Sequence, residues 1–234
     1  VDSGNLAGHL LTLRAGLLSL PQQLLAPSCV FEGLLDTLRL MEDLLEEVAA
    51  AMASDKNESG HETEPLLALL AESRALLETA SSQVPLTLTA QFNTFKTLSA
   101  CAKTFSDYSN PPTEAVSEQQ YWASAWVLQC QRASDELVWY CPWLELPESK
   151  QWPQALEGIA TLAGTTTFSE LSVYLENGLA AIKAQAQNPL FDAEHSSLNT
   201  LTPLLEKASI RMAERNALTA KLVLQATDFA TLEY

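Results

Sequence analysis

Apolar residues recur at steps of three and four along most of the chain, the spacing that places them on one face of an α-helix. The stretch from Cys29 to Ala53 shows this pattern most clearly. Its apolar positions are Leu34, Leu35, Leu38, Met41, Leu44, Leu45 and Val48. No stretch alternates between apolar and polar residues over a useful length, as a half-buried strand would. The sequence therefore predicts an all-α protein.

Prolines and capping residues divide this pattern into separate helices. We predict helices over residues 3–20, 29–53, 64–82, 86–106, 117–140, 153–162, 167–187 and 190–227. Pro21 ends the first, and Pro203 is expected to bend the last. Ser117 with Gln120, and Thr167 with Glu170, have the spacing of a capping box, which predicts two of the helix starts.

The connectors between these helices are short, which favours a multi-helix bundle of antiparallel helix pairs. Residues 1–234 read as one all-helical region. The firmest break is Tyr108-Ser-Asn-Pro-Pro-Thr113, which predicts subdomains 1–108 and 113–234. The segment from Ser54 to Glu62 has no strongly apolar side chain and is predicted to be an exposed loop.

Composition and charge exclude several classes of function. The chain has 234 residues, of which 47% are hydrophobic, and this is ample for a buried core. Its 13 basic and 29 acidic residues give a formal charge of −16. Nucleic acid and anionic lipid are therefore not expected as partners. No apolar run approaches the roughly 20 residues that span a bilayer, so we expect a soluble chain with no direct membrane contact.

The residue types that usually hold metals or act as nucleophiles are not arranged for that chemistry. Cys29, Cys101, Cys130 and Cys141 show no CxxC spacing, and we expect buried, unpaired thiols. His61-Glu-Thr-Glu64 lacks the HExxH arrangement and is expected to be a solvated loop. The glycine-rich motifs of nucleotide-binding folds are also missing, so no metal and no cofactor is predicted.

The first ten residues contain more polar and glycine positions than packing alone requires. Asp2 and Ser3 can cap the helix start, and Asn5 and His9 lie one turn apart. Gly4 and Gly8 are poor helix formers, which suggests that another group approaches this backbone closely.

Two terminal stretches carry a resemblance to a known family. Val1-Asp-Ser-Gly-Asn-Leu-Ala-Gly-His-Leu-Leu-Thr-Leu-Arg14 resembles a signature of the cyclic β-1,2-glucan synthases. The stretch from Ala213-Glu-Arg215 through Thr227-Asp-Phe-Ala-Thr-Leu-Glu-Tyr234 resembles, more loosely, that family's approach to its next glycoamylase-like segment. The resemblance implies an internal segment of a large glycosyltransferase, which makes cyclic β-1,2-glucan from UDP-glucose at the cytoplasmic side of the bacterial inner membrane.

The resemblance also implies where the segment works. It would belong to the glycoamylase-like region for processing and cyclisation, as part of an α/α barrel or as an insertion in one. The catalytic carboxylates would lie outside this chain, so the chain alone would be inactive. Its partners would be the β-1,2-glucan chain and the neighbouring domains of the synthase.

Asp2, Asn5 and His9 are the candidate substrate-binding residues under this resemblance. Helix starts line the pocket mouth of an α/α barrel, and Asp and Asn side chains suit sugar hydroxyls. The alternative is a helix cap with a polar edge. His9 could act as a base, although no nearby residue orients it. The alternative function is a helical scaffold or protein-interaction module without carbohydrate contact.

Two tryptophan pairs at helical spacing are a second candidate site for binding carbohydrate. Trp122 with Trp126, and Trp139 with Trp143, could form a platform for stacking sugars. Tryptophan at this spacing is more often part of a core, because each ring buries a large apolar area. We therefore favour the core interpretation.

Overall fold

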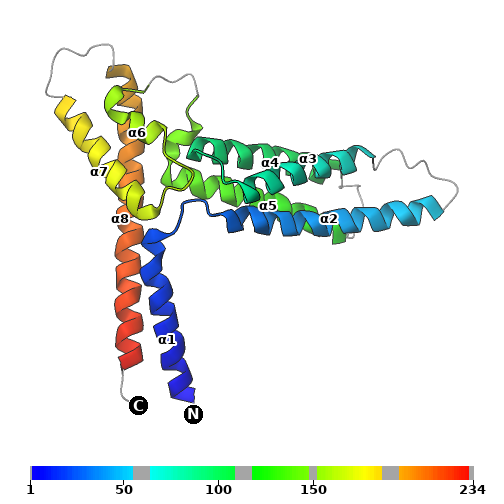
Figure 1. Ribbon diagram of the computed structural model, residues 1–234, viewed down its shortest axis with the longest axis horizontal. Coiled ribbons are helices and arrows are strands. Elements are labelled where there is room, and N and C mark those ends of the chain that lie inside the picture. The colour runs from blue at the N-terminus through cyan, green and yellow to red at the C-terminus, as the bar shows by residue number, and fades with distance from the viewer. Residues whose placement is uncertain (1, 55–63, 109–117, 148–151, 186–194, 232–234) are drawn as a thin grey trace. The chain divides into compact units, whose positions relative to one another are not determined.

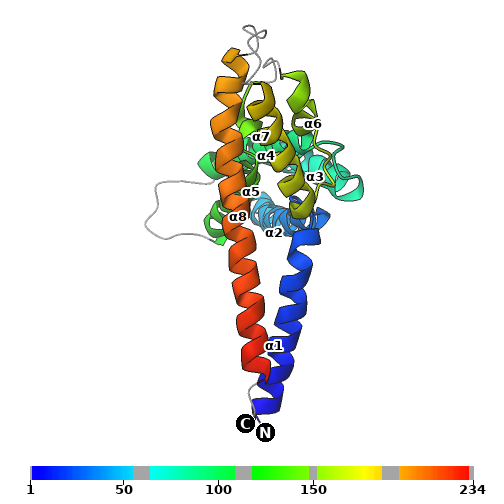
Figure 2. The ribbon, with the colours of Figure 1, turned by 90° about the vertical axis from the view of Figure 1, so that its left-hand side faces the viewer.

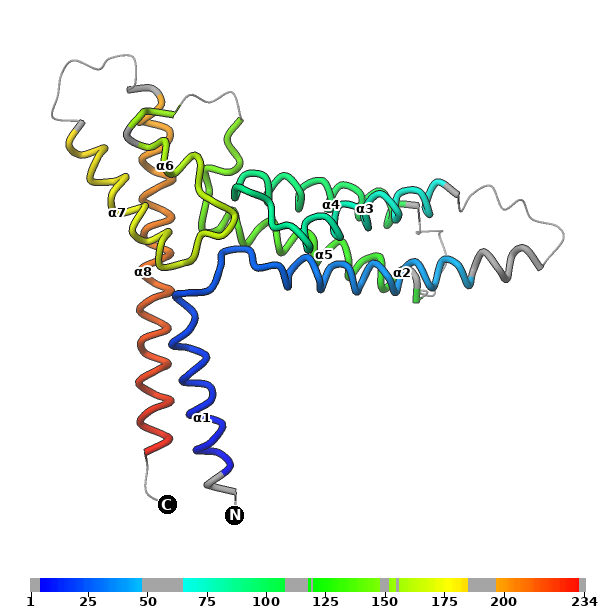
Figure 3. Tube along the Cα trace, in the orientation of Figure 1, coloured from blue at the N-terminus to red at the C-terminus, as the bar shows by residue number. Residues whose placement is uncertain are grey.

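The structure, a computed structural model, describes residues 2–54, 64–108, 118–147, 152–185 and 195–231 (Figures 1 and 3). Within these ranges the chain is all-α, as predicted, with helices in antiparallel pairs and no sheet. The α-helices are α1 (Asp2–Ser19), α2 (Ser28–Ser54), α3 (Glu64–Ser82), α4 (Leu88–Tyr108), α5 (Glu118–Tyr140), α6 (Glu157–Ala160), α7 (Phe168–Gln185) and α8 (His195–Thr231). Three short 3₁₀ segments are η1 (Leu20–Gln22), η2 (Pro142–Glu145) and η3 (Gln154–Leu156).

The chain divides into two compact units. One unit is the continuous stretch 26–137, and the other joins 1–25 to 138–234. The predicted break between 108 and 113 falls mainly on residues outside the described ranges. The helices on its two sides, α4 and most of α5, belong to the same unit.

The unit of residues 26–137 has an aromatic core. α2 packs against α3, and α3 against α4. The rings of Phe31 and Phe95 stack with centroids 4.7 Å apart, and Trp126 is fully buried. A hydrogen bond of 2.8 Å from the Thr37 hydroxyl to the Gln129 side chain joins α2 to α5. Aromatic stacking and buried apolar area therefore hold these helices together.

The other unit is built on α8, which contacts α7, η2 and α1. The first part of α8 buries Leu201, Leu205, Ala208 and Met212 at steps of four, three and four. From α7, Leu171 and Leu175 are also buried at helical spacing. This is the interior that an amphipathic helix pattern predicts.

The observed helix starts test the capping predictions. The Thr167–Glu170 capping box is confirmed, because the Thr167 backbone N–H donates to the Glu170 carboxylate at 2.8 Å and the Glu170 N–H donates to the Thr167 hydroxyl at 3.2 Å. The predicted start of the fourth helix at Leu86 is wrong by two residues, because the Thr87 hydroxyl accepts the Ala90 N–H and caps the helix there. Ser117 lies outside the described ranges.

The two ends of the sequence form neighbouring helices. α1 and α8 lie side by side and antiparallel in both views (Figures 1 and 2). α1 ends at Ser19 and η1 begins at Leu20, so the α-helix ends next to Pro21, as predicted. α8 continues through Pro203. The predicted start of α8 at residue 190 lies outside the described ranges.

Candidate functional site

The candidate sugar ligands lie on α1. Asn5 and His9 are both exposed and, four positions apart, share one face of the helix. The half-buried residues of α1 lie on a different face of the helix. They are Ala7, Leu10, Arg14 and Leu17. Asp2 is the first residue of α1, and its side chain is outside the described part. The structure therefore brings Asn5 and His9 together at an open surface.

The glycine at position 8 has open space beside it. A Cβ atom added to Gly8 would meet no atom within 4 Å. The expectation that another group approaches this backbone closely is therefore not met by any described residue of this chain.

We call α1 together with residues 213–231 of α8 the stalk. No described residue of α1 is buried, and Ala226 is the one buried residue among 213–231. The Arg14 side chain donates from Nε to the Thr227 hydroxyl at 2.9 Å across the pair. The stalk is thus a two-helix arrangement that leaves many leucines exposed to solvent.

Two arginines mark the point where α8 leaves the packed interior and enters the stalk. The Arg215 guanidinium lies 3.6 Å from the centre of the Phe168 ring and donates to the Leu20 carbonyl oxygen at 3.4 Å. The Arg211 guanidinium lies 3.6 Å from the centre of the Trp139 ring and donates to the carbonyl oxygen of the same residue at 2.5 Å. Arg215 therefore joins α8 to the start of η1 through a hydrogen bond and to the start of α7 through a cation–π contact.

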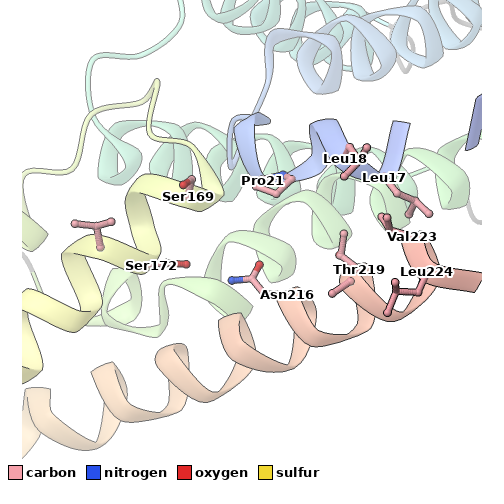
Figure 4. Close-up of a pocket in the computed structure, with 11 residues that line it drawn as sticks. Leu17, Leu18, Pro21, Ser169, Ser172, Asn216, Thr219, Val223 and Leu224 are labelled. Atoms are coloured by element: carbon pink, nitrogen blue, oxygen red, sulfur yellow. The ribbon is translucent and has the colours of Figure 1, made fainter. Parts of the chain in front are cut away.

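An apolar groove lies where α1, η1, α7 and α8 meet (Figure 4). Its volume is about 590 Å³, within the range of small-molecule sites. Its lining residues are Leu17, Leu18, Pro21, Ser169, Ser172, Val173, Asn216, Thr219, Ala220, Val223 and Leu224. None of them is charged, so the groove favours uncharged, mainly apolar groups.

The groove lining has no carboxylate, imidazole or thiol. No group of three or more His, Cys, Asp or Glu residues that could hold a metal occurs in the described ranges. His61 and Glu62 lie outside those ranges.

The cysteines are unpaired, as predicted, but their burial differs. Cys130 and Cys141 are buried, Cys101 is partly buried and Cys29 is exposed, so the expectation of burial is wrong for Cys29. Burial, and to a smaller degree the neighbouring Cys101, raises the pKa of Cys130 to about 12. Burial also raises the pKa of Cys141. Because the thiolate is the nucleophile, these two thiols are unreactive.

The structure places one member of each tryptophan pair in the core. Trp126 and Trp143 are buried, which confirms the core interpretation for one member of each pair. Trp139 is about half exposed, and Arg211 covers its ring. Trp122 is partly buried and contacts Tyr121 edge to face.

Comparison with protein-family models, with curated proteins and with solved structures finds no match. Among the helices of the described part, none combines the length and hydropathy that crossing a membrane requires. The site residues therefore have to be interpreted from their own geometry and from the sequence resemblance.

Proposed function

We propose that this chain is a helical segment of a cyclic β-1,2-glucan synthase that supports the glycoamylase-like processing and cyclisation region. The resemblance of residues 1–14 to the family signature carries the proposal. The exposure of Asn5 and His9 on one face of the helix formed by those residues supports it, because that face is accessible to a glucan.

The proposed role of α1 is to bind glucan. The Asn5 amide can both donate to and accept from sugar hydroxyls, and the His9 imidazole adds a second polar contact one turn away. Asp2 would be a third ligand. The open space beside Gly8 would let a sugar ring or a neighbouring domain approach the helix backbone. The reaction itself would belong to carboxylates elsewhere in the synthase, at the cytoplasmic side of the inner membrane.

The second candidate is a helical scaffold without carbohydrate contact. The exposed leucines of the stalk favour it, because large apolar surfaces often mark interaction sites. The two candidates differ in one respect: only the first requires Asp2, Asn5 and His9 to contact a sugar.

The deciding experiment is calorimetric titration with linear β-1,2-gluco-oligosaccharides. The titrated protein should be the synthase chain that contains this segment and its glycoamylase-like neighbours. We expect Asn5→Ala and Asp2→Ala each to weaken binding by about 1 kcal/mol or more, the value of a lost hydrogen bond. Ser19→Ala, at the exposed far end of α1, is the matched control and should leave the affinity unchanged. Unchanged affinity in folded Asn5→Ala and Asp2→Ala variants would leave the scaffold role.

A further inference from the structure

One side of the stalk carries a set of exposed large apolar residues, which we call the stalk stripe. Its members are Leu6 and Leu13 of α1 and Leu218, Leu222 and Phe229 of α8. Each is between 38% and 57% exposed. Leaving such side chains in water costs free energy that burial would recover, so the stripe is suited to an interface.

The stripe lies on a single side of the helix pair because of its register. In α1, Leu6 and Leu13 each come one position before a half-buried residue, Ala7 and Arg14 respectively. The Arg14 side chain contacts α8, which identifies the face of α1 that meets its partner. One position along a helix is a rotation of about 100°, so both leucines flank that face on the same side.

The same offset occurs in α8. Leu222 precedes half-buried Val223, and Phe229 precedes half-buried Ala230. Two antiparallel helices are related by a two-fold axis perpendicular to the plane that contains them. A residue that comes one position before a half-buried residue therefore lies on the same side of the pair in either helix. The groove leucines Leu18 and Leu224, labelled in Figure 4, each follow a half-buried residue, Leu17 and Val223 respectively. This opposite offset places them on the other side of the helix pair.

Charge favours the stalk over the rest of the chain as the place where a second copy can approach. The chain as a whole has a formal charge of −16, so two copies repel one another over most of their surface. Residues 1–20 and 213–231 contain three acidic and three basic side chains, Asp2, Glu214, Asp228, Arg14, Arg215 and Lys221. The stalk is therefore neutral in sum, and it is a part of the chain where a second copy can approach without that repulsion.

We propose that a second copy of this chain docks on the stalk stripe, with the two stalks forming a four-helix bundle about a two-fold axis. A two-fold interface uses the same patch on both copies, and a stripe shared by two antiparallel helices is suited to that pairing. This proposal is argued from the stripe and from the charge of the stalk, and it does not rest on glucan binding. His9 precedes half-buried Leu10 and so lies on the same side of α1 as Leu6 and Leu13, where a docked second copy would compete with a glucan for it.

The size of the stripe sets the expected strength of the dimer. The 18 residues of α1 extend about 27 Å, and two adjacent helices are about 20 Å wide. Such a face has an area of about 540 Å², less than the roughly 800 Å² that each partner buries in a standard stable interface and in the range of weak ones. We therefore expect a monomer–dimer equilibrium that depends on concentration in the micromolar range.

Sedimentation equilibrium of the 234-residue chain from about 1 to 100 μM tests the proposal. We expect the mass to rise with concentration from 25.5 kDa towards twice that value. The variant Leu13→Glu with Leu222→Glu should raise the dissociation constant at least about 100-fold, because it would bury unpaired charges. Circular dichroism should show unchanged helix content, since both positions are exposed.

The matched control is Leu11→Glu with Leu224→Glu, which changes two exposed leucines of the same helices outside the stripe. Its dissociation constant should stay within about threefold of that of the unchanged chain. A monomer at every concentration would overturn the proposal. Loss of the dimer in the control variant alone would also overturn it. So would a chain that stays monomeric and floats with neutral phosphatidylcholine vesicles, if the Leu13→Glu with Leu222→Glu variant does not float.

Discussion

The two parts of α8 have the same helical periodicity but different surroundings. α8 as a whole contacts α7, η2 and α1, and its first part, residues 195–212, buries Leu201, Leu205, Ala208 and Met212. Residues 213–231 face α1 and bury Ala226 alone among their side chains. The apolar spacing continues through both parts, and what changes is the number of elements packed around the helix.

This difference shows that burial depends on neighbours that local sequence does not specify. A helix in the first part is stabilised by a core with contacts on several sides. In the stalk, α8 packs mainly on α1 and meets α7 at Arg215 and along the groove, and its exposed leucines contribute little until something else covers them. Stability should therefore be concentrated in the first part of α8, and accessible interaction surface in the second.

The strongest test compares a leucine from each part. Leu205→Ala should lower the free energy of unfolding by about 2–5 kcal/mol, because the side chain is fully buried. Leu222→Ala should lower it by less than about 1 kcal/mol, because that side chain is 38% exposed. Urea denaturation at about 1 μM chain, below the proposed dimerisation range, measures both. Equal losses would contradict the contrast between the two parts.

Replacing either of two glycines by alanine should change the free energy of unfolding by a smaller amount, and the two changes should have opposite signs. A Cβ atom at Gly178 of α7 would lie 2.6 Å from Ile159 Cδ1 and 3.3 Å from Leu156 Cδ2, and both of these residues are buried. We expect Gly178→Ala to destabilise the chain by about 1 kcal/mol, since a packed methyl group must move.

Gly8→Ala, in the stalk, should instead stabilise the chain by about 0.5–1 kcal/mol through helix propensity alone. Thermal denaturation followed by circular dichroism compares the two variants. A loss of stability for Gly8→Ala would show that another group contacts α1 at this position.

The smallest expected effect concerns the capping box of α7, on which the first part of α8 packs. Hydrogen bonds from the backbone and side chain of Thr167 lower the pKa of Glu170 below its usual value of 4.5. A lowered pKa stabilises the folded state above pH 4.5, and this contribution is lost as the pH falls through the folded-state pKa. In Glu170→Gln the free energy of unfolding should therefore fall less steeply as the pH is lowered below 4.5.

Glu176→Gln, an exposed change on the same helix, is the control for this prediction. In this variant the free energy of unfolding should depend on acid pH as it does in the unchanged chain. Urea midpoints between pH 3 and 7 supply the comparison. An unchanged profile for Glu170→Gln would show that the carboxylate contributes no pH-dependent stability.

The elements could be predicted from sequence because helix periodicity and caps are local signals. The Thr167–Glu170 box and the end of α1 at Pro21 are confirmed for this reason. The grouping of helices could not be predicted, since the contacts that join residues 1–25 to 138–234 connect parts of the chain that are far apart in sequence. A Pro-Pro break marks a turn in the backbone and does not determine which helices share a core.

The candidate site could be predicted only where it lies on one helix. Asn5 and His9 share a face because of their spacing, and the structure adds that this face is exposed. The groove combines residues of α1, α7 and α8, and those of α1 are about 150 positions or more from those of the other two helices, so no local pattern indicates it. Arg215 had a detectable signal: it occupies the next helical step after Ala208 and Met212, where a core residue would be expected.

The isolated bridge between Leu24 and Thr167 has a consequence for the order of folding. Its hydrogen bonds, Leu25 N–H to the Thr166 carbonyl oxygen and Phe168 N–H to that of Gln23, close a loop of more than 140 residues. Such a closure is entropically costly while the intervening chain is unfolded, whereas stretch 26–137 needs only contacts within itself. We therefore expect the inner stretch to fold first and shorten the loop, an order that pulse-labelled amide exchange during refolding would record.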